Sequence, residues 1–297
     1  MSNEVELKLD IPKSHIRDFF KLDWFHSSPQ VSHKPDRYLE NIYFDTPSLE
    51  LLKDKSALRI RKIADVYYQT LKTKGTSVGG LHQRGEWEHK IDRAPEDRLP
   101  RLKPELFPVD AWPQSMTVNN LLPVFETNFT RKCWIWRSFS GSVVEVVLDE
   151  GVVVSGEQSK PICEIELELL EGNASCLFDL AEAICKDVPV LISDVTKAQR
   201  GFDLYSPGVW VFERDSLTDG APLCRLNAVL QYIMGSESLC SEVVEALLCL
   251  VQDGYLPTMD GIPWVLKLQS TSPDVIMRSQ WLLRLARHAW LLSNKDK

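Results

Sequence analysis

The chain has 297 residues and a mass of 33.9 kDa, which is enough for a full hydrophobic core and for two domains. Hydrophobic residues make up 44% of it and charged residues 26%, as is usual for a soluble globular protein. A net charge of −8 and a pI near 5.4 argue against a general nucleic-acid-binding surface, so any anion site must be local.

The seven cysteines contain no CxxC pair and no regular spacing, and most lie within apolar segments. This distribution predicts free thiols in a reducing compartment. The first residues are acidic and lead directly into a strand, so we expect no signal peptide. No apolar run approaches the ~20 residues that a bilayer-spanning helix needs. We therefore expect a cytoplasmic protein that binds neither membranes nor nucleic acid.

The first predicted strand, residues 4–8 with sequence EVELK, alternates charged and aliphatic side chains. Successive side chains of a strand point to opposite faces, so Glu4, Glu6 and Lys8 share one face. A short amphipathic helix around Ile16 to Phe20 follows, and then a loop that runs through about Pro35.

A series of strands is predicted next, with glycines 75, 79 and 80 forming a turn or mobile loop between two of them. The strands span residues 37–45, 57–63, 66–74, 83–91, 124–138, 142–154 and 162–170, with a rim loop over 92–123. Because most connections have hairpin length, an antiparallel sheet or barrel is favoured over a parallel one. The first convincing helix comes only at residues 177–184.

From about Tyr205 the pattern changes to a Pro- and Gly-containing linker followed by helical periodicity. Helices are predicted over residues 223–233, 238–253 and 274–292. We therefore predict two domains, a strand-rich one over residues 1–205 and a helical accessory region over 206–297.

Charged residues recur at alternate positions on several of these strands. The repeats are Arg59/Arg61, Arg84/Glu86/Glu88, Glu145/Asp149 and Glu164/Glu166/Glu168. A single strand of this kind is commonly a half-buried sheet facing water. Repetition favours a barrel with a polar interior and aliphatic residues outside, covered by helices. Carboxylates suit Mg²⁺, and Arg and Lys suit phosphate oxygens, so the pattern points to phosphate chemistry.

Seven segments, in this order, resemble the CYTH domain, or triphosphate tunnel metalloenzyme family. They are EVELK at 4–8, NIYFDT at 41–46, LRIR at 58–61, GLHQR at 80–84, LDEG at 148–151, CEIELEL at 163–169 and KAQRG at 197–201. The resemblance covers roughly residues 2–204. It is nearest to the bacterial inorganic triphosphatase branch, in which a CHAD-like helical region follows the CYTH domain.

The resemblance implies an α+β fold with an eight-stranded antiparallel tunnel and flanking helices. It implies hydrolysis of inorganic tripolyphosphate to pyrophosphate and orthophosphate with Mg²⁺ or Mn²⁺. By position, the implied metal-side carboxylates are Glu4, Glu6, Asp149, Glu164, Glu166 and Glu168. The implied phosphate-binding residues are Lys8, Arg59, Arg61, Lys72, Arg84, Arg131, Lys197 and Arg200. The implied catalytic residues are Glu4, Glu6, Lys8 and Glu166, and Glu86 and Glu88 are expected to organise the bases.

One departure from the family pattern falls on the strand after Phe129, which often carries two cations two residues apart. Here Arg131 is followed at that spacing by Cys133, while Lys132 should point to the opposite face. This substitution is expected to weaken the hold on one phosphoryl group.

Several single residues keep a structural alternative. Arg200 is equally expected to cap a helix end, and Asp45 to begin a turn. Tyr43 is either a sheet residue or a rim hydroxyl near the substrate. His82 and His89 are expected at the rim or in solvent, because nothing in the sequence has zinc spacing.

Other functions of the same fold remain open at this stage. They are thiamine triphosphatase, nucleoside triphosphatase and adenylyl cyclase, and from another class a polyphosphate-binding module without turnover. The sequence contains no recognisable base-binding pocket. The C-terminal helices are expected to pack on the tunnel or to mediate homodimerisation.

Overall fold

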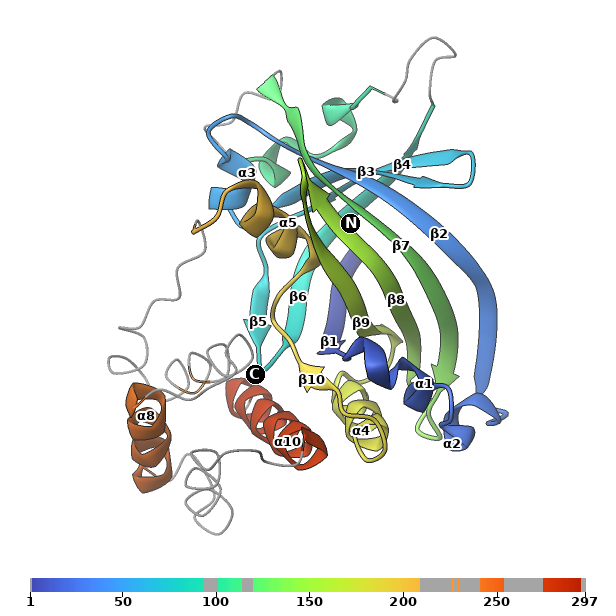
Figure 1. Cartoon of the computed structure of the whole chain (residues 1–297), viewed down its shortest axis with the longest axis vertical. Coiled ribbons are helices and arrows are strands. Elements are labelled where there is room, and N and C mark those ends of the chain that lie inside the picture. Colours follow the sequence, from blue (N-terminus) through green and yellow to red (C-terminus); the bar gives the residue numbers. More distant parts are fainter. Residues whose placement is uncertain are drawn as a thin grey trace.

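The computed structural model describes residues 2–92, 101–113, 120–208, 226, 229, 241–253 and 275–294. Its long strands are β1 (Ser2–Asp10), β2 (Val31–Asp45), β3 (Ala57–Ile63), β4 (Val66–Lys72), β6 (Leu81–Ile91), β7 (Leu122–Arg137), β8 (Val143–Ser155) and β9 (Gln158–Glu171). They pair antiparallel in the order β1-β9-β8-β7-β2-β3-β4-β6, and β6 pairs back with β1 (Figure 1). The predicted α+β fold with an eight-stranded antiparallel barrel is therefore confirmed.

Two short strands extend the sheet beyond the closed ring. β5 (Thr76–Val78) pairs with β6, and β10 (Leu191–Ile192) pairs with β1. Neither was predicted, because runs of two or three residues carry no readable alternation.

The outer face of the barrel is apolar over β1, β8 and β9, as the alternation of these strands predicts. Leu7, Val146 and Leu167 are fully buried there. Helices cover this face: α1 (Ile16–Phe19), α2 (Asp23–His26), α4 (Ser175–Ile184) and α10 (Val275–Ser293) contribute to the same hydrophobic cluster. Burying the aliphatic face against helices leaves the charged face of each strand to form the interior.

A second outer layer covers β3, β4 and β6. It consists of α3 (Glu50–Lys53) and two 3₁₀ turns, η2 (Pro104–Leu106) and η3 (Val109–Ala111). Leu51, Phe107 and Ala111 from these turns pack against Leu58 and Leu71 of the sheet. Part of the predicted rim loop is thus a hydrophobic cover for the barrel.

The helix α5 (Lys197–Tyr205) packs against β7, β8 and β9 (Figure 1). Phe202 of α5 meets the ring of Phe125 edge to face at 5.0 Å, and Phe125 stacks on Tyr43 at 4.5 Å. Gly201 makes this close packing possible, because a Cβ there would lie 2.1 Å from the Phe125 ring. The sequence had indicated no helix at α5, which has only nine residues.

The segment before residue 37 differs from the prediction. A loop was expected through Pro35, but β2 already begins at Val31 and runs to Asp45 without a break. The strand accommodates Pro35 at a register shift between Lys34 and Arg37. Proline is tolerated in strands at such irregular positions, which is why it misled the interpretation of the sequence.

The described C-terminal helices are α8 (Ser241–Gln252) and α10, close to two of the predicted helices. The predicted helix at 223–233 lies outside the described residues, apart from Leu226 and Val229. α10 packs against β10, α4 and β5, and Arg287 pairs with Asp179 at 2.7 Å. The boundary near residue 206 stays a prediction.

Every cysteine in the described ranges is a free thiol, as predicted; Cys224 and Cys240 lie outside them. Within the described part of the chain, none of the helices combines the length and apolar character that crossing a membrane requires.

Candidate active site in the tunnel

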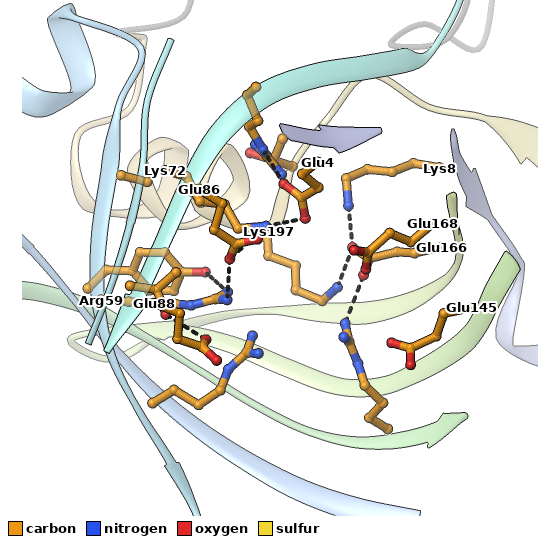
Figure 2. Close-up of a pocket in the computed structure, with 18 of the residues that line it drawn as sticks. Glu4, Lys8, Arg59, Lys72, Glu86, Glu88, Glu145, Glu166, Glu168 and Lys197 are labelled. Atoms are coloured by element: carbon orange, nitrogen blue, oxygen red, sulfur yellow. Dashed lines mark hydrogen bonds and ion pairs between the residues drawn. The ribbon is translucent and has the colours of Figure 1, made fainter. Parts of the chain in front are cut away.

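A polar cavity of about 310 Å³ lies inside the barrel (Figure 2). Its cationic lining residues are Lys8, Arg37, Arg59, Arg61, Lys72, Arg84, Arg131 and Lys197. Its acidic lining residues are Glu4, Glu86, Glu88, Glu145, Glu166 and Glu168. Ionic side chains of both signs therefore converge in one enclosed space, as the sequence pattern predicts.

Strand register brings together charges that are far apart in sequence. Glu4 of β1 lies opposite Arg84 of β6, and Lys8 lies opposite Glu166 of β9. Alternation determines which face each charge occupies, but the pairing of strands determines which opposite charge it meets.

The first group of ion pairs surrounds Glu4, which is 6% exposed. Its carboxylate accepts hydrogen bonds from Lys72 Nζ at 2.6 Å and from Arg84 Nε at 2.8 Å. Arg84 Nη2 donates to Glu6 Oε1 at 2.6 Å. Burial opposes ionisation of Glu4, but Lys72 and Arg84 outweigh it and hold the pKa of Glu4 well below its ordinary value.

The second group surrounds Glu166. Lys8 Nζ donates to its carboxylate, and Arg131 Nη2 donates to it at 2.8 Å. Arg131 also donates two parallel hydrogen bonds to Asp149, from Nε to Oδ1 at 2.8 Å and from Nη2 to Oδ2 at 2.6 Å. Although burial opposes ionisation, Lys197, Lys8 and Arg131 hold the pKa of Glu166 well below its ordinary value. These carboxylates are therefore anionic and neutralised within the protein.

The third group, on β3, is different because its cations are poorly neutralised. Arg61 Nε donates to Asn41 Oδ1 at 2.8 Å, and no carboxylate in the described part of the chain lies within 4.0 Å of its guanidinium. Arg59 has one carboxylate oxygen, from Glu86, at 3.8 Å, and its buried Nε has no partner. Burial, together with Arg59 and Arg131, lowers the pKa of Arg61 to about 9. This basic wall is a site that favours an anion.

All the predicted site residues except Glu6, Asp149, Glu164 and Arg200 line the cavity. Those four lie one layer behind it and bind lining residues or one another. Asp149 and Glu164 are 0% and 1% exposed. Arg200 pairs with Asp10, and with Glu164 at 3.2 Å, so it does not act as the helix cap weighed from the sequence.

The sequence interpretation missed Arg37 and Thr70 and gave Glu145 no role. Arg37 was masked by its position next to a segment with loop character. Glu145 had a usable signal, since it lies four residues before Asp149 on the same face of β8.

A family model for the CYTH domain matches residues 2–202. The chain belongs to the CYTH family. An inorganic triphosphatase from Haemophilus influenzae is 35% identical over 207 residues, which are 69% of this chain and 56% of that protein. The chain thus spans little more than half the length of this curated relative.

Two solved structures resemble the CYTH barrel at lower similarity. The Hippeastrum protein HpAC1, described as having a dominant triphosphatase activity, is 21% identical over 70% of this chain and 97% of its own, with a TM-score of 0.47. The Bacillus halodurans protein bh2851 is 19% identical over 67% of this chain and 98% of its own, with a TM-score of 0.44. The family model ends at residue 202, so the CHAD-like character of the remaining chain stays a prediction.

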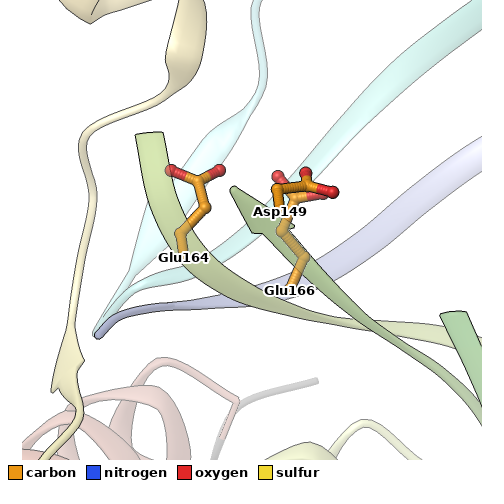
Figure 3. Close-up of side chains that lie close together, drawn as sticks. All are labelled: Asp149, Glu164 and Glu166. Carbon is orange, nitrogen blue, oxygen red and sulfur yellow. The ribbon is translucent and has the colours of Figure 1, made fainter. Parts of the chain in front are cut away.

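The CYTH tunnel has the donor set that a hard divalent cation needs. Asp149, Glu164 and Glu166 each offer an oxygen, and the three oxygens lie within 4.8 Å of one another (Figure 3). Lys197 Nζ contacts all three, at 2.6 Å from Asp149, 2.5 Å from Glu164 and 3.0 Å from Glu166. The Lys197 ammonium group already contacts all three carboxyl groups, so a metal ion there would compete with it.

Glu168 is a second candidate ligand for a cation, at a position that Lys197 does not contact. It lines the cavity, and no Lys or Arg nitrogen in the described ranges lies within 4.0 Å of its carboxylate. Burial and the neighbouring charge of Glu4 raise the pKa of Glu168 to about 7. Burial without a cationic partner makes the charged form of Glu168 unfavourable, and a divalent cation would stabilise it. The residues of the CYTH tunnel therefore fit a hard divalent cation, with Glu4, Glu166 and Glu168 facing the space that would hold it.

The structure shows the surroundings of Cys133, which stands where the family often has a second cation on this strand. Cys133 faces inward from β7 but is fully buried, and burial and Glu145 raise its pKa to about 11. Lys132 points outward and pairs with Asp36 at 2.5 Å, as predicted. β7 therefore contributes one cation to the tunnel, Arg131.

The alternatives left open for three residues can be decided. Asp45 is fully buried and accepts the backbone N–H groups of Thr46, Leu51 and Leu52 at 2.7 to 3.0 Å, so it organises a turn outside the cavity. Tyr43 lines the cavity and accepts a hydrogen bond of 3.4 Å from Arg59. His82 is 8% exposed and lines the smaller cavity beside the tunnel, so of the two expected positions, rim or solvent, the solvent position is excluded.

A smaller cavity of about 160 Å³ adjoins the tunnel and shares Lys72, Arg84 and Thr196 with it. Ser77 Oγ donates to Asp194 Oδ1 at 2.5 Å, and His82 Nε2 lies 3.5 Å from the same oxygen. Asp194 Oδ2 and His82 Nε2 are buried without a hydrogen-bond partner in the described part of the chain. This side cavity is polar but carries less charge than the tunnel.

Proposed function

We propose that this protein hydrolyses inorganic tripolyphosphate to pyrophosphate and orthophosphate in the tunnel, with Mg²⁺ or Mn²⁺. The observation that carries the proposal is that some charged side chains in the tunnel have partners of opposite charge and others do not. Among the described residues, Arg59 and Arg61 form a wall with few acidic partners, while Glu168, which has no Lys or Arg nitrogen within 4.0 Å, faces the same 310 Å³ space. A polyanion would neutralise the basic wall, and a divalent cation would neutralise the acidic side of the cavity.

In this proposal the basic wall binds and orients the substrate. Arg59 and Arg61 hold phosphoryl oxygens, and Lys72 and Lys8 exchange part of their contact with Glu4 and Glu166 for the substrate. A divalent cation held by Glu4, Glu166 and Glu168 would supply Lewis-acid chemistry and lower the pKa of a bound water. Glu166, with its depressed pKa, remains anionic at neutral pH and can accept a hydrogen bond from water on the acidic side. Phosphoryl transfer then depends mainly on positioning and charge stabilisation.

The test is a phosphate-release assay with tripolyphosphate, ATP and thiamine triphosphate, each with EDTA, Mg²⁺ or Mn²⁺. We expect turnover of tripolyphosphate that requires the metal. Glu4→Gln keeps the size of the side chain but removes a lining charge, so it should lower kcat/KM by about a hundredfold. Glu40→Gln, on the exposed side of β2, is the matched control. Equal turnover by both variants would refute the assignment.

A second candidate function is hydrolysis of an organic triphosphate. The side cavity favours it, because Asp194 and His82 present unpaired polar atoms next to Lys72 and Arg84. Hydroxyl or amino groups attached to a triphosphate would satisfy such atoms. A kcat/KM for ATP or thiamine triphosphate above that for tripolyphosphate would favour this function, and formation of cyclic AMP from ATP would indicate the adenylyl cyclase alternative.

Polyphosphate binding without turnover is the rival from another class. It is disfavoured because a pure anion binder gains nothing from a carboxylate such as Glu168 facing its ligand. Metal-independent binding of tripolyphosphate with no phosphate release would support it.

We also propose a cytoplasmic location and no nucleic-acid partner, which the free thiols among the described cysteines and the net charge of −8 support. Homodimerisation through the C-terminal helices stays a proposal.

A further inference from the structure

The strand β2 contains a bulge next to the tunnel. Lys34 pairs with Cys133 of β7, and Arg37 pairs with Arg131, so three steps on β2 match two steps on β7. In a regular strand, residues three apart point to opposite faces. The extra residue lets Lys34 and Arg37 both face the barrel interior, which is a known use of a β-bulge.

Contacts on the outside of the barrel anchor this bulge. Asp36 accepts from Lys132 Nζ at 2.5 Å and lies 3.1 Å from His33 Nε2. The carboxylate of Asp36 is thereby held away from the tunnel and cannot neutralise Arg37.

The two inward cations of the bulge differ in their partners. Lys34 Nζ donates to Glu145 Oε1 at 2.8 Å, so its charge is neutralised. Arg37 lines the cavity, and within the described residues no carboxylate lies within 4.0 Å of its guanidinium. Opposite Arg37, Arg131 is already bound to Asp149 and Glu166. Arg37 is therefore a cation whose charge the protein leaves available.

Arg37 extends the basic wall along β2. Asn41 and Tyr43, which contact Arg61 and Arg59, follow it on the same face of the strand. The next inward position of β7 after Arg131 is the uncharged Cys133. Among the inward-facing cations of β2 and β7, both of which the structure describes in full, Arg37 alone has no carboxylate within 4.0 Å.

We propose that Arg37 is a substrate-binding residue, which holds a terminal phosphoryl group of a linear polyphosphate. The inference rests on the proposed function, since it assigns one end of that substrate. A guanidinium can engage two phosphoryl oxygens at once, which gives the contact direction as well as charge.

The test is steady-state kinetics of tripolyphosphate hydrolysis by Arg37→Gln, Arg37→Lys and the wild type. Losing a charged hydrogen-bonding contact should raise KM by about tenfold to a hundredfold. The kcat should stay within about threefold, because binding is lost more than transition-state stabilisation. Arg37→Lys keeps the charge but not the paired geometry, so its KM should lie between the other two.

Arg137→Gln is the matched control, because Arg137 is exposed on β7 outside the cavity lining. An unchanged KM for Arg37→Gln, or an equal rise for Arg137→Gln, would overturn the inference.

If the wild type releases no phosphate, the proposed function fails. Calorimetric titration of tripolyphosphate in EDTA then tests Arg37 separately, with equal affinity of wild type and Arg37→Gln as the negative outcome. Circular dichroism spectra of all variants establish that they are folded.

Discussion

At the scale of single residues, the tunnel is organised by which charges are neutralised. Arg84 and Arg61 both line the same cavity, but Arg84 binds Glu4 and Glu6, whereas the partner of Arg61 among the described residues is the amide oxygen of Asn41. A buried cation with acidic partners supports the fold, and one without them costs stability and is available to a ligand.

The same substitution should therefore have opposite effects at these two positions. Arg61→Gln should raise the free energy of unfolding in EDTA by about 1 kcal/mol, because it removes a partly buried charge beside Arg59 and Arg131. Arg84→Gln should lower it by about 2 kcal/mol, because it leaves buried carboxylates short of a partner. Urea denaturation of both variants measures the difference. Arg61→Gln should also lose most of the thermal stabilisation that tripolyphosphate confers, and a full stabilisation would contradict its binding role.

Glu168 provides a pH-dependent prediction. Its ordinary pKa is 4.5 and its folded pKa is about 7, so between these values the folded state binds more protons than the unfolded state. Stability from this group is present below pH 4.5 and is lost as the pH rises to 7. In EDTA, Glu168→Gln should raise the free energy of unfolding at pH 8 by about 2 kcal/mol, allowing for solvent screening, and change it little at pH 4.5. Denaturant titrations at both pH values test this, and an equal change at the two would contradict it.

At the scale of elements, a strand bulge and a short helix determine where two of the tunnel cations lie. The bulge in β2 turns Arg37 into the tunnel, and α5 brings Lys197 into it. Short strands and turns with few residues carry little sequence signal, yet they decide where several of the charges lie.

The turn after β2 gives a prediction at this scale. Asp45 accepts three backbone N–H groups at the start of α3 and lies outside the cavity lining. Asp45→Ala should therefore lower the free energy of unfolding by about 2 kcal/mol, since these buried donors lose their acceptor. The KM of the folded protein for tripolyphosphate should not change. Urea denaturation and steady-state kinetics measure the two quantities, and a raised KM with normal stability would assign Asp45 to the site instead.

At the scale of the whole molecule, the C-terminal helices and the barrel share one hydrophobic cluster. Leu283, Ala286 and Ala289 of α10 are fully buried, and they belong to the same cluster as Leu7 on the outer face of β1. A Cβ on Gly79, at the turn between β5 and β6, would lie 2.3 Å from the Ala286 carbonyl oxygen. α10 thus covers an apolar face that the barrel would otherwise expose.

Loss of this cover should affect stability more than substrate choice. Leu283→Ala should lower the free energy of unfolding by about 3 kcal/mol through the cavity it creates, with the KM unchanged. Removal of residues 206–297 should cause unfolding or aggregation by exposing the outer face. Thermal melts and light scattering test both variants. A well-folded truncated protein that has lost turnover would contradict this role and place the helices in catalysis.

Most of the barrel, and the inward direction of its charges, could be predicted from strand alternation, because a period of two assigns each side chain to a face without knowledge of its neighbours. The sequence also contained the ordered segments that resemble the family. It could not reveal that Arg61 and Arg37 have no carboxylate within 4.0 Å in the part of the chain that the structure describes, while Lys8 and Arg84 do. That difference depends on register between strands more than 70 residues apart and on one bulge, both of which arise only when the barrel closes.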